Sequence, residues 1–425
     1  KNKEIKEINF QFPLWDSTKH DNGYTCELAY NFQFPLWDSR PHEFPLRFLF
    51  TPLKGSLIYL IRNLLKCFTA SDKPILQNSK LSYPKMKKKL LNKKENITVL
   101  FVDRLDLDRN FALLREEMEA RGGISEDLRG WSWIKNSRVK PLSEFKLSVS
   151  EVTHRYCPTY RDIYLKRIAK VNAPPSIKTI RGIAYHEVFH EASLKIKQFI
   201  YNNKIISGGD LLSEFLPKLE EFSERIVSFS ENRTFKLKQF EHDMLKRECY
   251  ILYRYLIIQA ASKIDAVLSK YRFINQESLV NEVLPSISEK KVDGSLVGFS
   301  KELSVDIYTP FNAIADIKTG DIRNFHRHIL AAYALAIESS ERIAVDFGMI
   351  IYVKTDLERQ VPYFKIDYFI IGDELRIEAL EFRDKSFEIL TVAKDPGKPL
   401  QCPDYCPYFL YCNPQLAATK ALEYG

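Results

Sequence analysis

The spacing of the cysteines constrains this chain more than any other feature of its sequence. Three of the seven cysteines lie close together near the C-terminal end, in the pattern Cys402-x3-Cys406-x5-Cys412. An odd count, and no recognisable signal-peptide pattern, lead us to expect no secreted disulfide framework. Three clustered thiols together with one distant thiol instead suit a four-sulfur site for Zn²⁺ or for an iron–sulfur cluster.

The four remaining cysteines are the candidates for the last position of that site. Cys157 fits best, because it precedes Pro158 just before the stretch of the chain that carries the acidic motifs. Cys249 falls in an apolar run with helical spacing, which is typical of a core thiol, and Cys26 and Cys67 lie in an atypical first quarter. We therefore expect a site that clamps the two ends of one domain together, with the ligands Cys157, Cys402, Cys406 and Cys412. Spacing alone leaves zinc and iron–sulfur both open.

Composition excludes several classes of protein. The 425 residues are 45% hydrophobic and 28% charged, which is ordinary for a soluble globular chain. No apolar run approaches the roughly 18 residues that span a bilayer, so we expect a cytoplasmic protein without a membrane segment.

Residues 1–110 hold +7 of the net charge of +8, so the total charge is a weak indication of an anionic partner. A DNA groove in the rest of the chain must come from local clustering of charge.

From about residue 110 onwards, apolar periodicity predicts an α+β fold. Spacing near 3.6 predicts helices over 111–121, 182–199, 211–228 and 235–271. An N-cap pattern from Ser148 to Glu151 predicts a further helix that includes Cys157 and runs toward residue 168. Apolar or alternating runs predict strands at 280–284, 303–308, 313–318, 347–353 and 363–371. Helices at 322–339 and 375–393 complete a small mixed sheet, with a β-α-β step across 313–353.

Two of the expected strands each carry a carboxylate. Asp306 lies in one strand, and Asp316 and Lys318 lie two residues apart in the next, hence on one strand face. Converging carboxylates can hold Mg²⁺ or Mn²⁺, which polarises a phosphoryl oxygen and generates hydroxide from water. A nearby lysine can neutralise charge that develops in the transition state. The pattern indicates phosphodiester hydrolysis, although taken alone it is also common on solvated strand faces.

The order of motifs around these residues resembles the RecB-type nuclease domain of the PD-(D/E)xK group. Gly182-x3-His186 precedes Asp306 and Asp316-x-Lys318, and Tyr333 follows on a helix rich in small residues. The resemblance covers about residues 182–353 and implies Lys318 as the catalytic lysine, Tyr333 as a supporting residue, and as metal ligands His186, Asp306, Asp316 and the carbonyl of Ile317. Relatives usually carry Gln four residues before the Tyr, where this chain has Ile329. His328 or His326 is the candidate substitute.

One cysteine before the nuclease motifs and three after them is the arrangement of iron–sulfur RecB-like nucleases, including the AddB type. Together with the segments 128–133, 148–152 and 156–158, it resembles the fourth CRISPR-associated (Cas) family and most of all its archaeal type I-A relative, the Csa-one subfamily. This resemblance favours a structural [4Fe–4S] cluster over zinc. It implies trimming of single-stranded or overhanging DNA with Mg²⁺ or Mn²⁺, by 5′-to-3′ exonuclease or endonuclease action. It also implies a role in CRISPR adaptation beside the integrase and its partners, and it leaves an oligomer open.

The first quarter contains an identical repeat. Residues 9–17 recur as 31–39, 22 residues further on, while the residues between the copies share no pattern. A structural repeat keeps apolar positions through the whole unit, whereas translated repeat–spacer DNA would give this layout. A genuine peptide repeat that binds a partner is the alternative. Because adaptation genes lie next to CRISPR arrays, we expect residues 1–105 to be array and leader DNA read through in frame.

The rest of the chain then divides into three parts. We expect an N-terminal helical segment at 106–180, a nuclease domain at 181–395 with a helical insertion at about 205–275, and a cysteine segment at 396–425. Two other functions fit the same residues. One is a non-catalytic DNA-binding scaffold of the adaptation complex, stapled by iron–sulfur or zinc. The other is a zinc-stapled regulator whose carboxylates lie on a solvated surface.

Overall fold

A computed structural model describes residues 104–135, 137–174, 176–205 and 207–415 of the chain. The repeat at 9–17 and 31–39, the cysteines Cys26 and Cys67, and nearly all of the expected leader lie outside the described residues. Within the described ranges, no helix has both the length and the apolar character that crossing a membrane requires.

A mixed sheet of five strands lies at the centre of the described part, in the same order as the chain. Its strands are β1 (Ile287–Val292), β2 (Leu303–Thr309), β3 (Ala313–Lys318), β4 (Phe347–Asp356) and β5 (Val361–Ile370). Neighbouring strands are antiparallel except β3 and β4, which run parallel with Asp316 beside Ile350. The expected α+β fold and its β-α-β step are confirmed.

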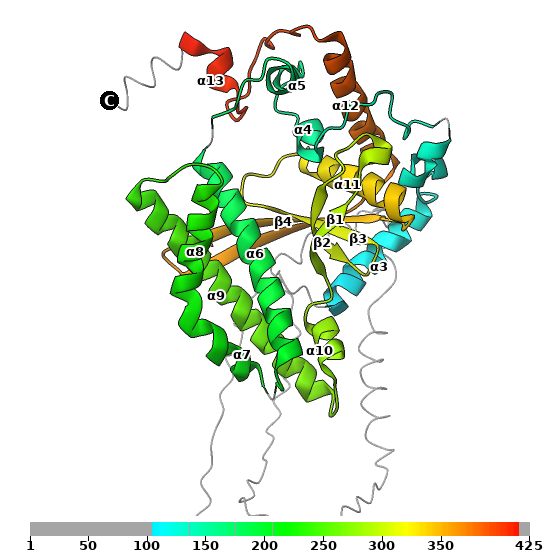
Figure 1. The fold of residues 1–425 in the computed structure, drawn as a ribbon. Helices are drawn as coiled ribbons and strands as arrows, with labels where there is room; N and C mark the ends of the chain where they lie inside the picture. The colour runs from blue at the N-terminus through cyan, green and yellow to red at the C-terminus, as the bar shows by residue number, and fades with distance from the viewer. Residues whose placement is uncertain (1–103, 136, 175, 206, 416–425) are drawn as a thin grey trace, which may run out of the picture. The chain divides into compact units, whose positions relative to one another are not determined.

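Helices cover both faces of this sheet (Figure 1). One face packs against α3 (Arg104–Ala120), α6 (Ile177–Asn202), α9 (Gln239–Lys270) and α10 (Gln276–Val283), and α7 (Gly208–Phe215) and α8 (Leu219–Asn232) pack on α9. The other face packs against α4 (Val149–Thr153), α11 (His326–Glu341) and α12 (Asp373–Val392). The remaining elements are short: α5 (Arg161–Arg167), α13 (Phe409–Cys412), and the 3-10 turns η1 (Glu126–Leu128), η2 (Gly130–Ile134), η3 (Leu216–Lys218) and η4 (Ser295–Val297).

Alternation along β3 explains why this strand is buried on both sides. Ala313, Ala315 and Ile317 belong to the core beneath α6 and α9. Ile314 belongs to the core beneath α11. A strand whose apolar residues are buried between two helical layers is typical of parallel pairing.

The prediction of a strand at 280–284 is wrong. Those residues belong largely to α10, which begins after Asn275, whose side-chain oxygen accepts a hydrogen bond from the Ser278 N–H at 2.7 Å. A short apolar run does not distinguish a strand from a buried helical turn. The first strand of the sheet is instead β1, whose polar run from Ser288 to Lys291 hides its strand character.

Two expected helices are interrupted. The helix expected from Ser148 through Cys157 is split into α4 and α5, and Cys157 lies between them. Pro158 disfavours helical geometry at the residue before it. The helix expected at 211–228 is likewise divided into α7 and α8, with Pro217 in the turn between them.

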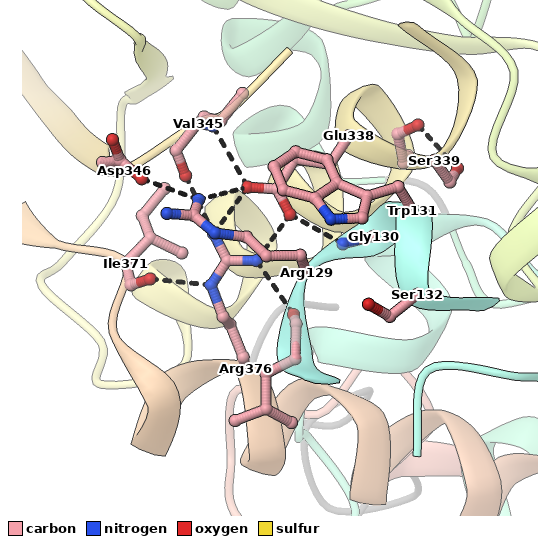
Figure 2. A network of polar contacts seen from close by, with 12 residues as sticks. Arg129, Gly130, Trp131, Ser132, Glu338, Ser339, Val345, Asp346, Ile371 and Arg376 are labelled. Carbon is pink, nitrogen blue, oxygen red and sulfur yellow. Dashed lines mark hydrogen bonds and ion pairs between the residues drawn. The ribbon is translucent and has the colours of Figure 1, made fainter. Parts of the chain in front are cut away.

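A buried carboxylate on α11 joins three segments that are distant in the sequence (Figure 2). Glu338 accepts hydrogen bonds from Arg376 Nη1 and Nη2 at 2.7 and 2.9 Å, and both side chains are fully buried. Arg129 Nη1 and the Gly130 N–H also donate to it, at 2.8 and 2.7 Å. A Cβ at position 130 would lie 2.1 Å from the carbonyl oxygen of Leu335, so the close approach requires glycine.

These contacts decide the charge of Glu338. Burial alone would raise the pKa of this carboxyl, but the charge and hydrogen bonds of Arg376 outweigh burial and hold it below its usual range. Arg376 is itself saturated by further bonds to the carbonyls of Ile371, Leu128 and Val345. A buried ion pair this fully satisfied is costly to break from one side.

We expect Arg376→Met to lower the free energy of unfolding by about 3–5 kcal/mol, because it leaves a buried carboxylate short of its main partner. Lys385→Met is the control: Lys385 forms an exposed pair with Glu388 at 2.7 Å, and such pairs contribute about 0–1 kcal/mol. Equilibrium denaturation of both variants measures the difference. Equal losses in the two variants would contradict a central role for Glu338.

Candidate active site

The structure brings four of the expected site residues into contact. His186 lies on α6, Asp306 on β2, and Asp316 and Lys318 on β3. His186 Nδ1 lies 3.2 Å from Asp306 Oδ2. Lys318 Nζ lies 2.6 Å from Asp316 Oδ2, in agreement with their expected position on one strand face.

Strand register places the two aspartates side by side. β2 pairs with β3 at Ile307 and Ala315, so the next pair along the ladder is Asp306 with Asp316. The pairing of the two backbones stops before this position. The Ile317 N–H donates its hydrogen bond to the side chain of Asp306 instead, at Oδ2 and 2.9 Å. The side chain of Asp306 thus takes a backbone donor at the point where the two strands separate.

The electrostatic environment differs sharply between the two carboxyls. Burial would raise the pKa of Asp306, but His186, Lys318 and the Ile317 N–H outweigh it and hold the pKa well below its usual range. Burial raises the pKa of Asp316 well above its usual range, and the charge of Asp306 adds to this against the pull of Lys318. The charge of Asp306 also raises the pKa of His186 against the effect of burial. His186 and Lys318 are therefore the positive partners of the two carboxyls.

Tyr333 lies on α11 and is close to these carboxylates. Burial raises the pKa of its hydroxyl, and the charges of Asp316, Asp306 and Glu289 raise it further. Two histidines were candidates to replace the Gln that relatives usually carry before this tyrosine. Of these, His326 is the one close to Lys318. Burial, and after it the charge of Lys318, lowers the pKa of His326 to about 3. His328 instead faces α12, where Nε2 contacts Glu378, and Ile329 is buried in the core.

Glu289 on β1 is a site residue that the sequence analysis missed. One ligand atom each from His186, Glu289 and Asp306 can be chosen so that all three lie within 4.8 Å of one another. The three residues also line a cavity that includes His190, Ser288 and Ile317. The pairing of β1 with β2 could have revealed this residue. Ser288 pairs with Ile307 in the antiparallel register, which puts Glu289 opposite Asp306. The incorrect strand at 280–284 concealed it.

The donor set fits a hard divalent cation. Carboxylate oxygens, an imidazole nitrogen and a backbone carbonyl are ligands of Mg²⁺ and Mn²⁺. Asp316 Oδ2 is buried and has no hydrogen-bond partner of good geometry, although the Lys318 ammonium lies beside it. His186 and Glu289 are each about 30% exposed at the side chain, which leaves an approach from solvent.

The four expected cluster cysteines come from two segments that are far apart in the sequence, one at residue 157 and one at residues 402–412. Cys157 and Cys406 are buried, Cys402 and Cys412 are half-buried, and all four are free thiols. Burial raises the pKa of Cys406 to about 12, and the thiols of Cys157 and Cys412 raise it further. Burial also raises the pKa of Cys412, and Cys402 and Cys157 act in the same direction. Cys249 is fully buried in the main core, as expected of a core thiol.

Contacts around these thiols join the chain near 157 to the chain near 400. Arg161 binds Asp395 through Nε at 2.8 Å and Nη2 at 2.7 Å, and its Nη1 lies 3.4 Å from Cys412 Sγ. Thr159 Oγ1 donates to the carbonyl of Gly397 at 2.7 Å. Thiols such as those on these two segments are ligands suited to zinc or an iron–sulfur cluster.

An aromatic row connects the cysteine region with the loop that follows Lys318. The ring of Tyr156 lies 6.2 Å from that of Tyr405 and 5.5 Å from that of Phe325. The guanidinium of Arg323 lies 4.1 Å above the ring of Tyr405. His154 lies 5.5 Å from Phe325. The loop between β3 and α11 is therefore in contact with both the first and the last cysteine segments.

Comparison with known proteins places the chain in a family. The sequence profile described as CRISPR-associated exonuclease Csa1 matches residues 106–415. A protein of that name from Saccharolobus solfataricus is 32% identical over 296 residues, which cover 68% of this chain and 93% of the relative. Another of the same name, from Thermoproteus tenax, is 27% identical over 303 residues, 71% of this chain and 96% of the relative. The resemblance found in the sequence is thereby confirmed: the chain belongs to the CRISPR-associated exonuclease Csa1 family.

Proposed function

We propose that this chain is a metal-dependent DNA nuclease of the PD-(D/E)xK type that trims single-stranded or overhanging DNA in CRISPR adaptation. The observation that carries the proposal is the convergence of His186, Asp306, Asp316 and Lys318 at one point. The relatives are named CRISPR-associated exonucleases, which supports the nuclease activity. The role in adaptation, beside the integrase, rests on family membership.

The residues of the chain divide the chemistry between them. His186, Asp306, Asp316 and the carbonyl of Ile317 would hold Mg²⁺ or Mn²⁺. A cation bound there supplies Lewis-acid polarisation of the scissile phosphoryl group and acidifies water. The Lys318 ammonium, held by Asp316 at 2.6 Å, is placed to neutralise charge on the phosphoryl oxygens. Tyr333, beside the carboxylates on α11, would be a supporting residue of the site.

The aromatic row supports a single-stranded substrate. Tyr405 is 40% exposed, and Tyr156 and Phe325 extend the row toward the neighbourhood of Lys318. Aromatic faces bind unpaired bases by stacking without sequence preference. Arg323, which lies over Tyr405, adds a positive charge for the phosphate backbone.

A [4Fe–4S] cluster on Cys157, Cys402, Cys406 and Cys412 would be structural. The small core around Cys406 and Tyr408 packs Leu165 from α5 against the C-terminal segment. A cluster would add four covalent bonds to this packing. Its expected role is to hold the aromatic row, and through it the loop after Lys318, in place.

Lys318→Ala and Asp316→Ala should each lower the rate of single-stranded DNA cleavage in Mn²⁺ by at least about 100-fold. The first removes the positive charge that neutralises the reacting phosphate, and the second removes a proposed ligand of the metal. The substrate is an end-labelled oligonucleotide, and fragments are resolved on a sequencing gel. Lys301→Ala, which changes an exposed lysine, is the matched control and should cleave like the wild type.

Two results would contradict the nuclease proposal. Equal cleavage by the wild type and both variants would show that the activity comes from another source. Binding of DNA without cleavage by any of the proteins, in Mn²⁺ or Mg²⁺, would instead favour the non-catalytic scaffold.

Anaerobically purified wild-type protein should show a visible thiolate-to-iron absorbance band and about four iron atoms and four sulfides per chain. Cys406→Ser should lose most of both, and should also lose nuclease activity because the aromatic row is released. Cys249→Ala is the control and should keep its iron, since Cys249 lies in the main core. Stoichiometric zinc without iron in the wild type would contradict the cluster.

A further inference from the structure

Glu289 stands out on β1 by its backbone as well as by its position. Its φ of 53° lies in the left-handed region, which a non-glycine residue rarely adopts within a strand. Paired register runs through Ser288 with Ile307 and Lys290 with Val305, on either side of Glu289 and Asp306. The irregular backbone thus occurs at the residue that faces Asp306 across the hairpin.

The side chain of Glu289 is held toward Asp306 by its neighbours. The Ser304 hydroxyl donates to Glu289 Oε2, and Lys291 Nζ donates to the same hydroxyl at 3.1 Å. Ser304 precedes Asp306 by two residues on β2, so one strand orients both carboxylates. The result is the group of His186, Glu289 and Asp306, with one ligand atom from each within 4.8 Å of the others.

Charge around this group is unbalanced. Glu289 and Asp306 bring two carboxylates to this group beside a single imidazole, that of His186. Lys318 is committed to Asp316 at 2.6 Å. The ammonium of Lys291 lies 3.8 Å from Glu289 and its side chain is 77% exposed, so solvent screens it. A divalent cation between His186, Glu289 and Asp306 would remove most of this repulsion.

We propose that Glu289 is a further ligand of the divalent cation, binding it together with His186 and Asp306. This inference rests on the proposed function for the presence of the cation. It adds a carboxylate from β1 to the ligands supplied by α6, β2 and β3. The irregular backbone at Glu289 serves to turn that carboxylate into the site.

Binding of Mn²⁺ to the purified full chain tests this without any DNA or turnover. Titrations followed by electron paramagnetic resonance of free Mn²⁺ give the dissociation constant of wild type, Glu289→Gln, Asp306→Asn and Glu302→Gln. Glu302 is an exposed glutamate beside β2 and serves as the matched control. Glu289→Gln should raise the dissociation constant at least about tenfold, since even residues that only support metal ligands are worth about 10–100-fold. Glu302→Gln should leave it unchanged.

The outcomes separate this inference from the proposed function. If Asp306→Asn weakens Mn²⁺ binding while Glu289→Gln binds like Glu302→Gln, Glu289 is no ligand and the nuclease proposal stands. If the wild type fails to bind Mn²⁺, the metal-dependent function itself is overturned. Metal-free thermal melts check folding. Should Glu289→Gln melt early, Glu289→Asp, which keeps the charge but withdraws it by one methylene, must show the same weakened binding for the inference to hold.

Discussion

The buried carboxylate of Glu338 fixes α11, and the geometry of the candidate site depends on that helix. α11 connects β3 with β4, so its position determines how these two strands run parallel at the centre of the sheet. Arg376 and Arg129 hold it from α12 and from the segment before η2. The same helix carries Tyr333 on the side of the carboxylates. The ion pair of Glu338 and Arg376 thus fixes the helix that follows β3, the strand of Asp316 and Lys318.

A second constraint comes from the two cysteine segments. Arg161 and Thr159 bind the chain around residues 395–397, and Tyr156 meets both Tyr405 and Phe325. Phe325 belongs to the loop that leaves β3 after Lys318. The segments that carry the thiols and the loop after Lys318 are therefore connected by packing.

The correct and the incorrect strand predictions both have physical causes. The strands 303–308 and 313–318 were predicted correctly because each is apolar with a polar residue at fixed spacing, and both end close to the predicted positions. The run 280–284 was misread because a few consecutive apolar residues satisfy either period. β1 was missed because its charged residues look like a solvated turn. Glu289 was lost with it, since its role exists only in register with Asp306.

By itself, the sequence determined the α+β class, the shared strand face of Asp316 and Lys318, and the family. Each of these follows from residue types at short spacings, which local geometry converts directly into shared faces. Tertiary structure alone decided that Glu289 joins His186 and Asp306, that His326 and not His328 lies near Lys318, and that Glu338 anchors α11. Those facts depend on strand register and helix packing between residues up to about two hundred positions apart, and no local pattern encodes such distances.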